Sequence, residues 1–523
     1  MSSTLLKPER TVPADLPATR LPGLFDWTGS FRAKVQQPAI AFLVCCLLAV
    51  GAIAVMGYHP GIEDDALYLS AVKSDLNPSL YPHDAEFFRT QLQATILDKC
   101  VAGTARWTGM PVDVTVLLWQ FASIALILFG AWSIARLLFA EAAAQWAGVA
   151  FLGAMLTLPV AGTALFIADQ HLHPRNVATA LLLLAVSRIL ANQRWQALPL
   201  LVIAFSVHPI MAALGISFCF FLALVMLNPA YARFHISRES LASATPLGWI
   251  LEAPTPAWHK ALATRSYFFL NQWAWYEWLG AVAPLFLFGL LWRIARRRGE
   301  HTLERFALAV MVYGAFQFAV AVFVLSTPAL IRLTPMQPMR FLQLIYVFMV
   351  LIAGCLLGKW VLRARVWRWA VLFVATSAGM FMAQRELFAG TEHLELPGRR
   401  STNEWLQAFA WIRQNTPQDA YFAMDPLYMA APGEGYHGFR ALAERSQLAD
   451  NVKDPSVVAQ VPELGPEWER QTDALQGWTN FGPADFKRLH YQFGVNWVLV
   501  KYPQPAGLSC AWHNAALSVC EIR

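Results

Sequence analysis

Three adjacent carboxylates, Glu63, Asp64 and Asp65, follow the first long apolar stretch of the chain by a few residues. Carboxylates this close repel one another, and burial at a lipid interface disfavours their charged forms further. The arrangement therefore needs a partner such as a cation, a metal ion or a substrate hydroxyl, or a task in proton transfer. The competing interpretation is the first turn of a helix, where the helix dipole favours acids. We interpret the cluster as functional.

A second polar cluster occupies residues 169–176, in a very short connection between two apolar stretches. In an extended segment His171 and His173 point the same way, and with Asp169 they offer nitrogen and oxygen ligands for a metal. Alternatively, His173 caps a helix that begins at Pro174, and Arg175 binds lipid headgroups. No spacing in this segment is diagnostic of a metal site, so both interpretations stay open.

Three more polar residues lie in or beside apolar stretches. His208 interrupts one such stretch, and an ionisable residue within a span is a functional candidate. A neutral imidazole bonded to a carbonyl freed by Pro209 explains it equally well, and we favour this structural role. Arg332 and Arg340 flank a proline-rich turn, where fixed guanidinium groups suit a phosphate, although general contact with lipid headgroups is the alternative.

The elements that must hold these residues are membrane spans. The chain of 523 residues is 57% hydrophobic and 14% charged, an apolar excess beyond that of water-soluble chains. A helix crosses a hydrocarbon core of about 30 Å with about 20 apolar residues. About nine stretches qualify as spans by this criterion, at 38–57, 112–139, 143–168, 174–192, 197–227, 278–292, 306–326, 341–358 and 369–384.

Basic residues cluster in the short connections at 293–305 and 359–368, as the positive-inside rule expects of a cytoplasmic face. We therefore place the N-terminal tail, residues 1–37, in the cytoplasm. The segments expected on the opposite face are 58–111, 169–173, 228–277, 327–340 and 385–523. The net charge of +6 forms no continuous stripe, so we do not expect nucleic acid as a partner. This orientation fits a multi-pass protein of a bacterial inner membrane.

The first outer segment, 58–111, has apolar residues at helical spacing in Asp64–Leu76 and Glu86–Leu97. This spacing predicts two interfacial helices that lie on the membrane. Asn77-Pro78 and Tyr81-Pro82 break the helical pattern between them and turn the chain.

The last segment, 385–523, has the composition of a folded domain outside the membrane. Helical patterns near 403–415 and 484–493 alternate with short strand patterns near 421–424, 497–500 and 517–522. Cys510 and Cys520 flank a short polar turn, and we expect them to be bonded if this domain lies outside the cytoplasm. The predicted fold is mainly α: a polytopic helical bundle at 38–384 with a small extracytoplasmic α/β domain.

This layout resembles the GT-C superfamily of integral-membrane glycosyltransferases. The resemblance lies in the acids Glu63 to Asp65 at the opening of an outer loop of two interfacial helices, in the second acidic outer loop at Asp169, and in the C-terminal domain. Asp64 to Tyr68 and His208-Pro209 look like an uncharacterised bacterial branch. Asp169-Gln170-His171 departs from the Asp-x-Asp or Glu-x-Asp form of the oligosaccharyltransferase branch.

The resemblance implies transfer of a sugar, with inversion, from a polyprenyl-phosphate donor to an acceptor glycan, lipid or protein. Asp65 or Asp64 would then act as the base. Arg332 or Arg340 would stabilise the departing lipid phosphate. The residues expected to position substrate are Glu63, Asp169, His171, His173, Arg175 and His208. A divalent metal is compatible with Asp65, Asp169 and His171 but not required, because the leaving group is already a phosphate.

Two other classes of protein are compatible with parts of this pattern. A lipid or small-molecule transporter also uses broken helices, but it predicts polar residues deep within several spans. Apart from His208, the apolar stretches carry few polar residues, and the candidate site residues are expected at one face of the membrane. A non-catalytic scaffold that binds a ligand with its outer domain leaves the two acidic segments unexplained.

Overall fold

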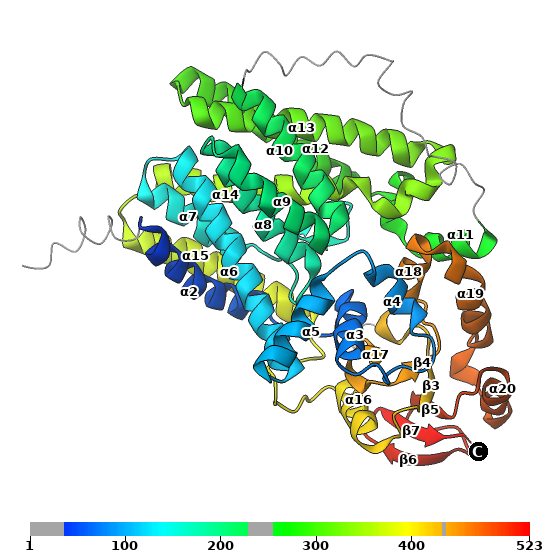
Figure 1. Ribbon diagram of the computed structural model, residues 1–523. Helices are drawn as coiled ribbons and strands as arrows, with labels where there is room; N and C mark the ends of the chain where they lie inside the picture. Colours follow the sequence, from blue (N-terminus) through cyan, green and yellow to red (C-terminus); the bar gives the residue numbers. More distant parts are fainter. Residues whose placement is uncertain (1–35, 228–254, 431–435, 523) are drawn as a thin grey trace, which may run out of the picture.

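The computed structural model describes residues 36–227, 255–430 and 436–522. Within these ranges seven helices are long and apolar enough to cross a membrane. The apolar bundle, which Figure 1 shows apart from the C-terminal sheet, comprises α2 (Pro38–Met56), α6 (Val112–Leu138), α7 (Ala142–Ala154), α8 (Pro174–Leu190), α9 (Arg194–Val207), α10 (Pro209–Leu227), α12 (Trp275–Arg298), α13 (His301–Ser326), α14 (Phe341–Leu357) and α15 (Val366–Leu387). The prediction of a polytopic helical bundle is confirmed.

The third predicted span, 143–168, is helical only as far as Ala154. The chain then forms a two-stranded antiparallel hairpin of β1 (Pro159–Val160) and β2 (Leu165–Phe166). Proline has no N–H to continue the helical ladder and clashes with the preceding turn, so Pro159 disfavours a continuous helix across this stretch. One predicted span is thus a 13-residue helix followed by a hairpin.

The fifth predicted span, 197–227, which contains His208-Pro209, is divided at His208 into α9 and α10. The Ser206 carbonyl, near the end of α9, accepts a hydrogen bond from the Ile96 N–H of the outer loop (3.2 Å). The Met226 carbonyl, near the end of α10, accepts one from Arg305 at the start of α13 (3.5 Å). The helix α9 therefore ends beside the outer loop, and α10 leads away from it.

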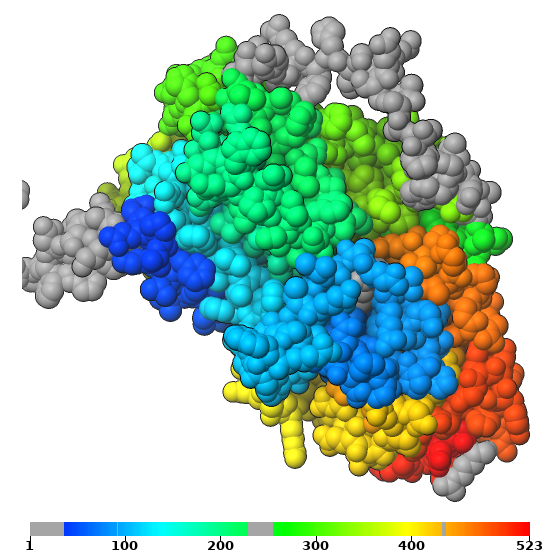
Figure 2. All heavy atoms as spheres, viewed as in Figure 1, coloured from blue at the N-terminus to red at the C-terminus, as the bar shows by residue number. Residues whose placement is uncertain are grey.

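The outer loop contains α3 (Asp65–Leu76), α4 (Glu86–Leu92) and α5 (Leu97–Thr108). The predicted first helix is confirmed, whereas the predicted second one divides into α4 and α5. The helix α3 is buried on several sides. Leu67 packs with Val457 of the C-terminal domain, and Leu69 packs in a cluster with Ala441. Figure 2 shows the outer loop between the bundle and the C-terminal domain.

The C-terminal domain is built on a mixed five-stranded sheet in the order β4-β3-β5-β7-β6. Its strands are β3 (Tyr421–Met424), β4 (Ser446–Gln447), β5 (Trp497–Lys501), β6 (Ser509–His513) and β7 (Leu517–Glu521). The strand β3 runs parallel to β4 and β5, and β7 is antiparallel to β5 and β6. The alternation of α16 (Glu404–Asn415), α17 (Phe439–Ala443), α18 (Asp454–Gln460), α19 (Gly465–Ala474) and α20 (Pro483–Phe493) with these strands confirms the α/β prediction.

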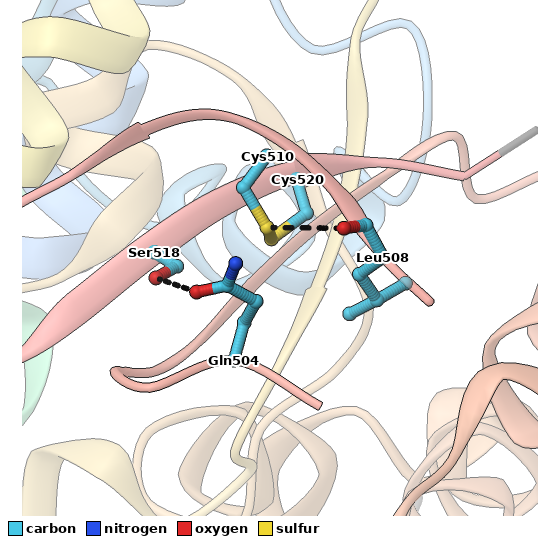
Figure 3. Close-up of a disulfide and its surroundings, with 5 residues drawn as sticks. All are labelled: Gln504, Leu508, Cys510, Ser518 and Cys520. Atoms are coloured by element: carbon cyan, nitrogen blue, oxygen red, sulfur yellow. Dashed lines mark hydrogen bonds between the residues drawn. A yellow bond between two sulfur atoms is a disulfide. The ribbon is translucent and has the colours of Figure 1, made fainter. Parts of the chain in front are cut away.

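A disulfide joins Cys510 and Cys520 across β6 and β7, at positions that face each other in the sheet register. Figure 3 shows the bond beside the hydrogen bond between Ser518 and Gln504. The predicted pairing is therefore confirmed.

Segments predicted to share one side of the membrane do gather at one end of the bundle. Residues from 58–111, 169–173 and 327–340 line one common cavity, and so do residues of 255–277. The remainder of the predicted outer segment 228–277 lies outside the described residues, as does almost all of the predicted N-terminal tail at 1–37.

Candidate functional site

A cavity of about 910 Å³ lies where the bundle, the outer loop and the C-terminal domain meet. One part of its wall is polar and includes Asp64, Asp169 and Arg340. Another part is apolar and includes Val160, Leu165, Phe166, Ile210 and Leu387. The two acidic segments predicted to converge thus line the same cavity. Its size and mixed wall suit a ligand with both a charged and an apolar portion.

The acidic turn sends its carboxylates in different directions. Gly61 takes a left-handed backbone (φ 81°), and Glu63 does so as well (φ 48°), which is unusual for a residue with a side chain. After this turn the Asp65 carboxylate points back and accepts the Gly61 N–H at 2.6 Å. Asp65 is 2% exposed and is not among the residues that line the cavity, whereas Glu63 and Asp64 line it. Burial raises the pKa of Asp65 to about 6.

Asp64 lines the cavity, and its side chain is 38% exposed. Its Oδ2 lies 3.6 Å from His173 Nε2, and its Oδ1 lies 3.7 Å from Lys453 Nζ. Burial raises the pKa of Asp64, but the neighbouring His173 and the positive charge of Lys453 lower it by more, so it stays well below its ordinary value. Asp64 is therefore a charged carboxylate within reach of a bound molecule.

The segment around Asp169 is a rigid turn. The Arg175 guanidinium donates to both Asp169 oxygens, at 3.1 and 2.6 Å, and both side chains are buried. Burial raises the pKa of Asp169, but the charge and hydrogen bonds of Arg175 together with the neighbouring His173 and His171 lower it by more. The spans support the backbone of this turn, because Gln120 donates to the Asp169 carbonyl (2.7 Å) and Gln343 to the Ile167 carbonyl (2.8 Å).

His173 caps α8, because its Nδ1 accepts the Arg175 N–H at 2.9 Å. This is the helix-cap interpretation of the second cluster. Since Nδ1 is an acceptor, the ring proton of neutral His173 lies on Nε2, which faces Asp64. Burial, and then the charge of Arg175, lower the pKa of His173 to about 4, so the ring is neutral at physiological pH.

The residues considered as metal ligands do not form a metal site. Both Asp169 oxygens are engaged by Arg175, and Asp65 is turned away from the cavity. His171 lines the cavity, and neither of its ring nitrogens has a hydrogen-bond partner in the described structure. Across the described ranges, no group of three or more His, Cys, Asp or Glu side chains is arranged to hold a metal ion.

Cationic groups line the cavity together with Asp64. Arg175 Nη1 and Arg340 Nε are both buried and have no hydrogen-bond partner among the described residues. A buried N–H of a charged group without a partner is costly, so these atoms mark where an anion would be stabilised. Arg332, the other predicted phosphate ligand, is not among the cavity-lining residues.

His208 lines the cavity at the turn between α9 and α10 rather than within a span. Its Nδ1 accepts the Met211 N–H (3.4 Å), a contact with the backbone of the first turn of α10. The ring stacks near His173, with 5.9 Å between the centroids. His208 therefore closes one edge of the site.

Lys453 and Arg265 also line the cavity, although neither was predicted as a site residue from the sequence. Lys453 bonds Glu63 across a sequence separation of 390 residues. No periodicity or spacing in the chain relates residues this far apart. The only signal for such a partner is general, because a crowded acidic cluster needs a cation beside it.

The sequence matches no protein-family model and no curated protein. Among solved structures, the fold is similar to the archaeal oligosaccharyltransferase AglB from Archaeoglobus fulgidus, in complex with an inhibitory peptide and a dolichol-phosphate. The TM-score is 0.39 at 13% sequence identity, and the match covers 90% of this chain and 70% of that chain.

Proposed function

We propose that the chain is a membrane glycosyltransferase that moves a sugar from a polyprenyl-phosphate donor to an acceptor, with inversion at the anomeric carbon. The observation that carries this proposal is a charged carboxylate, Asp64, in the same cavity as two guanidinium groups with unpartnered N–H atoms, those of Arg175 and Arg340. A base and an anion site in one interfacial cavity are the two requirements of this reaction.

In this mechanism the acceptor oxygen or nitrogen forms a bond to the anomeric carbon as the bond from that carbon to the lipid phosphate oxygen breaks. The acceptor proton passes to Asp64, and the electron pair leaves with the phosphate. The acceptor proton becomes more acidic as the new bond forms, so a carboxylate of low pKa suffices as a base. Asp65 supports this turn from behind through its bond to the Gly61 N–H.

Arg175 and Arg340 would stabilise the negative charge that develops on the departing phosphate. Asp169 already holds one edge of the Arg175 guanidinium, which orients the remaining Nη1 without a rearrangement when the donor binds. These two guanidinium groups supply the positive charge that a metal ion could otherwise supply, since the residues present do not form a metal site. This preorganisation is the usual source of catalytic stabilisation.

The apolar part of the cavity wall supports a lipid-linked donor. Val160, Leu165 and Ile210 lie next to the polar groups in the same cavity. A polyprenyl chain would lie along these residues and leave between the spans. The disulfide and the basic connections at 293–305 and 359–368 support the placement of this cavity on the periplasmic face of a bacterial inner membrane.

The test is a transfer assay with the full chain in phospholipid vesicles and a panel of radiolabelled polyprenyl-phosphate monosaccharides. We expect release of polyprenyl phosphate from at least one donor, and loss of that activity in Asp64→Asn. The matched control is Asp113→Asn, which changes an exposed acid in the first turn of α6. Mass spectrometry of lipids co-purified with the wild-type chain identifies the donor independently. Full activity in Asp64→Asn rejects the assignment of the base.

A further inference from the structure

We propose that Lys453 is a positioning residue through which the C-terminal domain completes the site, by holding Glu63 and orienting the Asp64 carboxylate into the cavity. The role assigned to Asp64 rests on the proposed function, whereas the pairing itself does not. This inference gives the C-terminal domain a part in the site besides covering it.

The contacts of Lys453 cross from one part of the chain to another. Its Nζ is hydrogen-bonded to Glu63 Oε2 and lies 3.7 Å from Asp64 Oδ1. The Lys453 side chain is 7% exposed, whereas Glu63 and Asp64 are 61% and 38% exposed. The ammonium is thus enclosed while the carboxylates stay open to a ligand in the cavity. A buried ammonium requires such partners.

The backbone of Lys453 is held by a turn of buried acids. Asp450 Oδ1 accepts the N–H groups of Val452 and Lys453. Asp454 accepts the Asp450 N–H (2.9 Å) and both ends of the Arg440 guanidinium, at 2.8 and 3.0 Å. This network consists of charge-assisted bonds between buried groups, which are the strong class of hydrogen bond. Lys453 is therefore presented to the acidic turn from a rigid support.

The electrostatic consequence is local to the acidic turn. Without Lys453, Glu63 and Asp64 would be adjacent carboxylates with no ammonium beside them. An opposite charge at this distance lowers the pKa of a carboxyl by about one to three pH units, so its removal raises the pKa of Asp64 by an amount in that range. The other ionisable groups that face Asp64 are Glu63, Tyr68, His173, Arg175 and Arg340.

A second buried lysine offers a matched control. Lys73 of α3 also ties the outer loop to the C-terminal domain, because its Nζ bonds the Ala441 carbonyl and Glu444 Oε1, each at 2.8 Å. Lys73 is 5% exposed and is not among the cavity-lining residues. Lys73→Met and Lys453→Met therefore remove comparable interdomain contacts, but only the second removes a charge beside Asp64.

The experiment measures the protonation of Asp64 directly. Dicyclohexylcarbodiimide, an apolar reagent, adds to protonated carboxyl groups, and fragment mass spectrometry locates the adduct. In the full chain in detergent, we expect the pH at which Asp64 labelling falls by half to rise by about one to three units in Lys453→Met. Lys453→Arg, which keeps the charge, should stay near the wild type, and Lys73→Met should leave the curve unchanged. Lys453→Gln serves the same purpose if methionine prevents folding.

An unchanged Asp64 curve in both neutral Lys453 variants overturns the proposal, and so does an equal shift in Lys73→Met. In the transfer assay, the acid limb of kcat/KM should move by the same amount as the labelling curve, with activity recovering at higher pH. If the labelling shifts but no donor is turned over by the wild type, the proposed function fails while the pairing of Lys453 with Asp64 stands.

Discussion

Glu395→Gln should destabilise the junction between the bundle and the C-terminal domain. The Glu395 carboxylate accepts a hydrogen bond from His59 Nδ1 at 2.8 Å and another from His437 Nε2 at 2.7 Å. Both imidazoles are fully buried, and Glu395 is 10% exposed. Burial raises the pKa of Glu395, but the charge and hydrogen bonds of the two histidines lower it by more, from 4.5 to about 2.

The lowered pKa sets both the size of the effect and its pH window. At 1.36 kcal/mol for each pKa unit, the difference corresponds to about 3 kcal/mol of folding free energy. Because the folded-state pKa is the lower one, this stability is fully present above pH 4.5 and is lost as the pH falls through about 2. The gap between wild type and Glu395→Gln should therefore shrink to about 1 kcal/mol at pH 3.

Thermal unfolding of the purified chain, followed by tryptophan fluorescence, measures this effect. For a chain of 523 residues, a loss of about 3 kcal/mol lowers Tm by roughly 3 °C at neutral pH. The control is Glu386→Gln, which changes an exposed glutamate near the end of α15. Equal Tm values for Glu395→Gln and wild type at pH 7, or a gap that stays constant down to pH 3, would refute the reasoning.

Three further changes have distinct expected outcomes. Asp65→Asn should slow transfer less than Asp64→Asn does, because an asparagine oxygen still accepts the Gly61 N–H and the side chain does not line the cavity; equal losses in the transfer assay would contradict this. Reducing the disulfide that links β6 and β7 should lower the unfolding free energy by about 2 to 3 kcal/mol, which denaturant titration with and without reductant measures. Asp169→Asn should lower the unfolding free energy by about 3 to 5 kcal/mol, because the guanidinium of Arg175 is left buried and unpaired. A loss of similar size when EDTA is added to the wild type would instead indicate a metal at Asp169.

The spans were predictable because the bilayer imposes a simple requirement on composition and length. Long apolar runs such as α2 and α13 satisfy it without reference to the rest of the chain. Pro159 and Pro209 lie within two of the predicted spans, and a proline favours a break there because it lacks the N–H of the helical hydrogen-bond ladder. The direction taken after each break was not predictable. It depends on packing, as in the contact of α10 with the start of α13 through Met226 and Arg305.

The site was predictable in part for a similar reason. Glu63 to Asp65 and Asp169 were predicted as site residues because a charged side chain beside lipid is costly in free energy. Asp64 and Asp169 both line the one cavity. The partners of these acids were not predictable. Arg175 is close enough in sequence to be a candidate ion-pair partner of Asp169. Lys453, in contrast, is the N-cap residue of α18, a seven-residue helix far along the chain, and no sequence pattern marks it.

The three acids of the first cluster show how backbone conformation divides chemically similar groups into different roles. The left-handed residue Glu63 reverses the chain just before α3, so successive carboxylates cannot share one environment. Glu63 and Asp64 line the cavity beside the Lys453 ammonium, which is hydrogen-bonded to Glu63, whereas Asp65 accepts a backbone N–H and does not line the cavity. Of the three, Asp64 alone combines a charged carboxylate held by groups on both sides with an open path to a ligand. This asymmetry is the physical basis for choosing Asp64 rather than Asp65 as the base, a choice that the sequence left open.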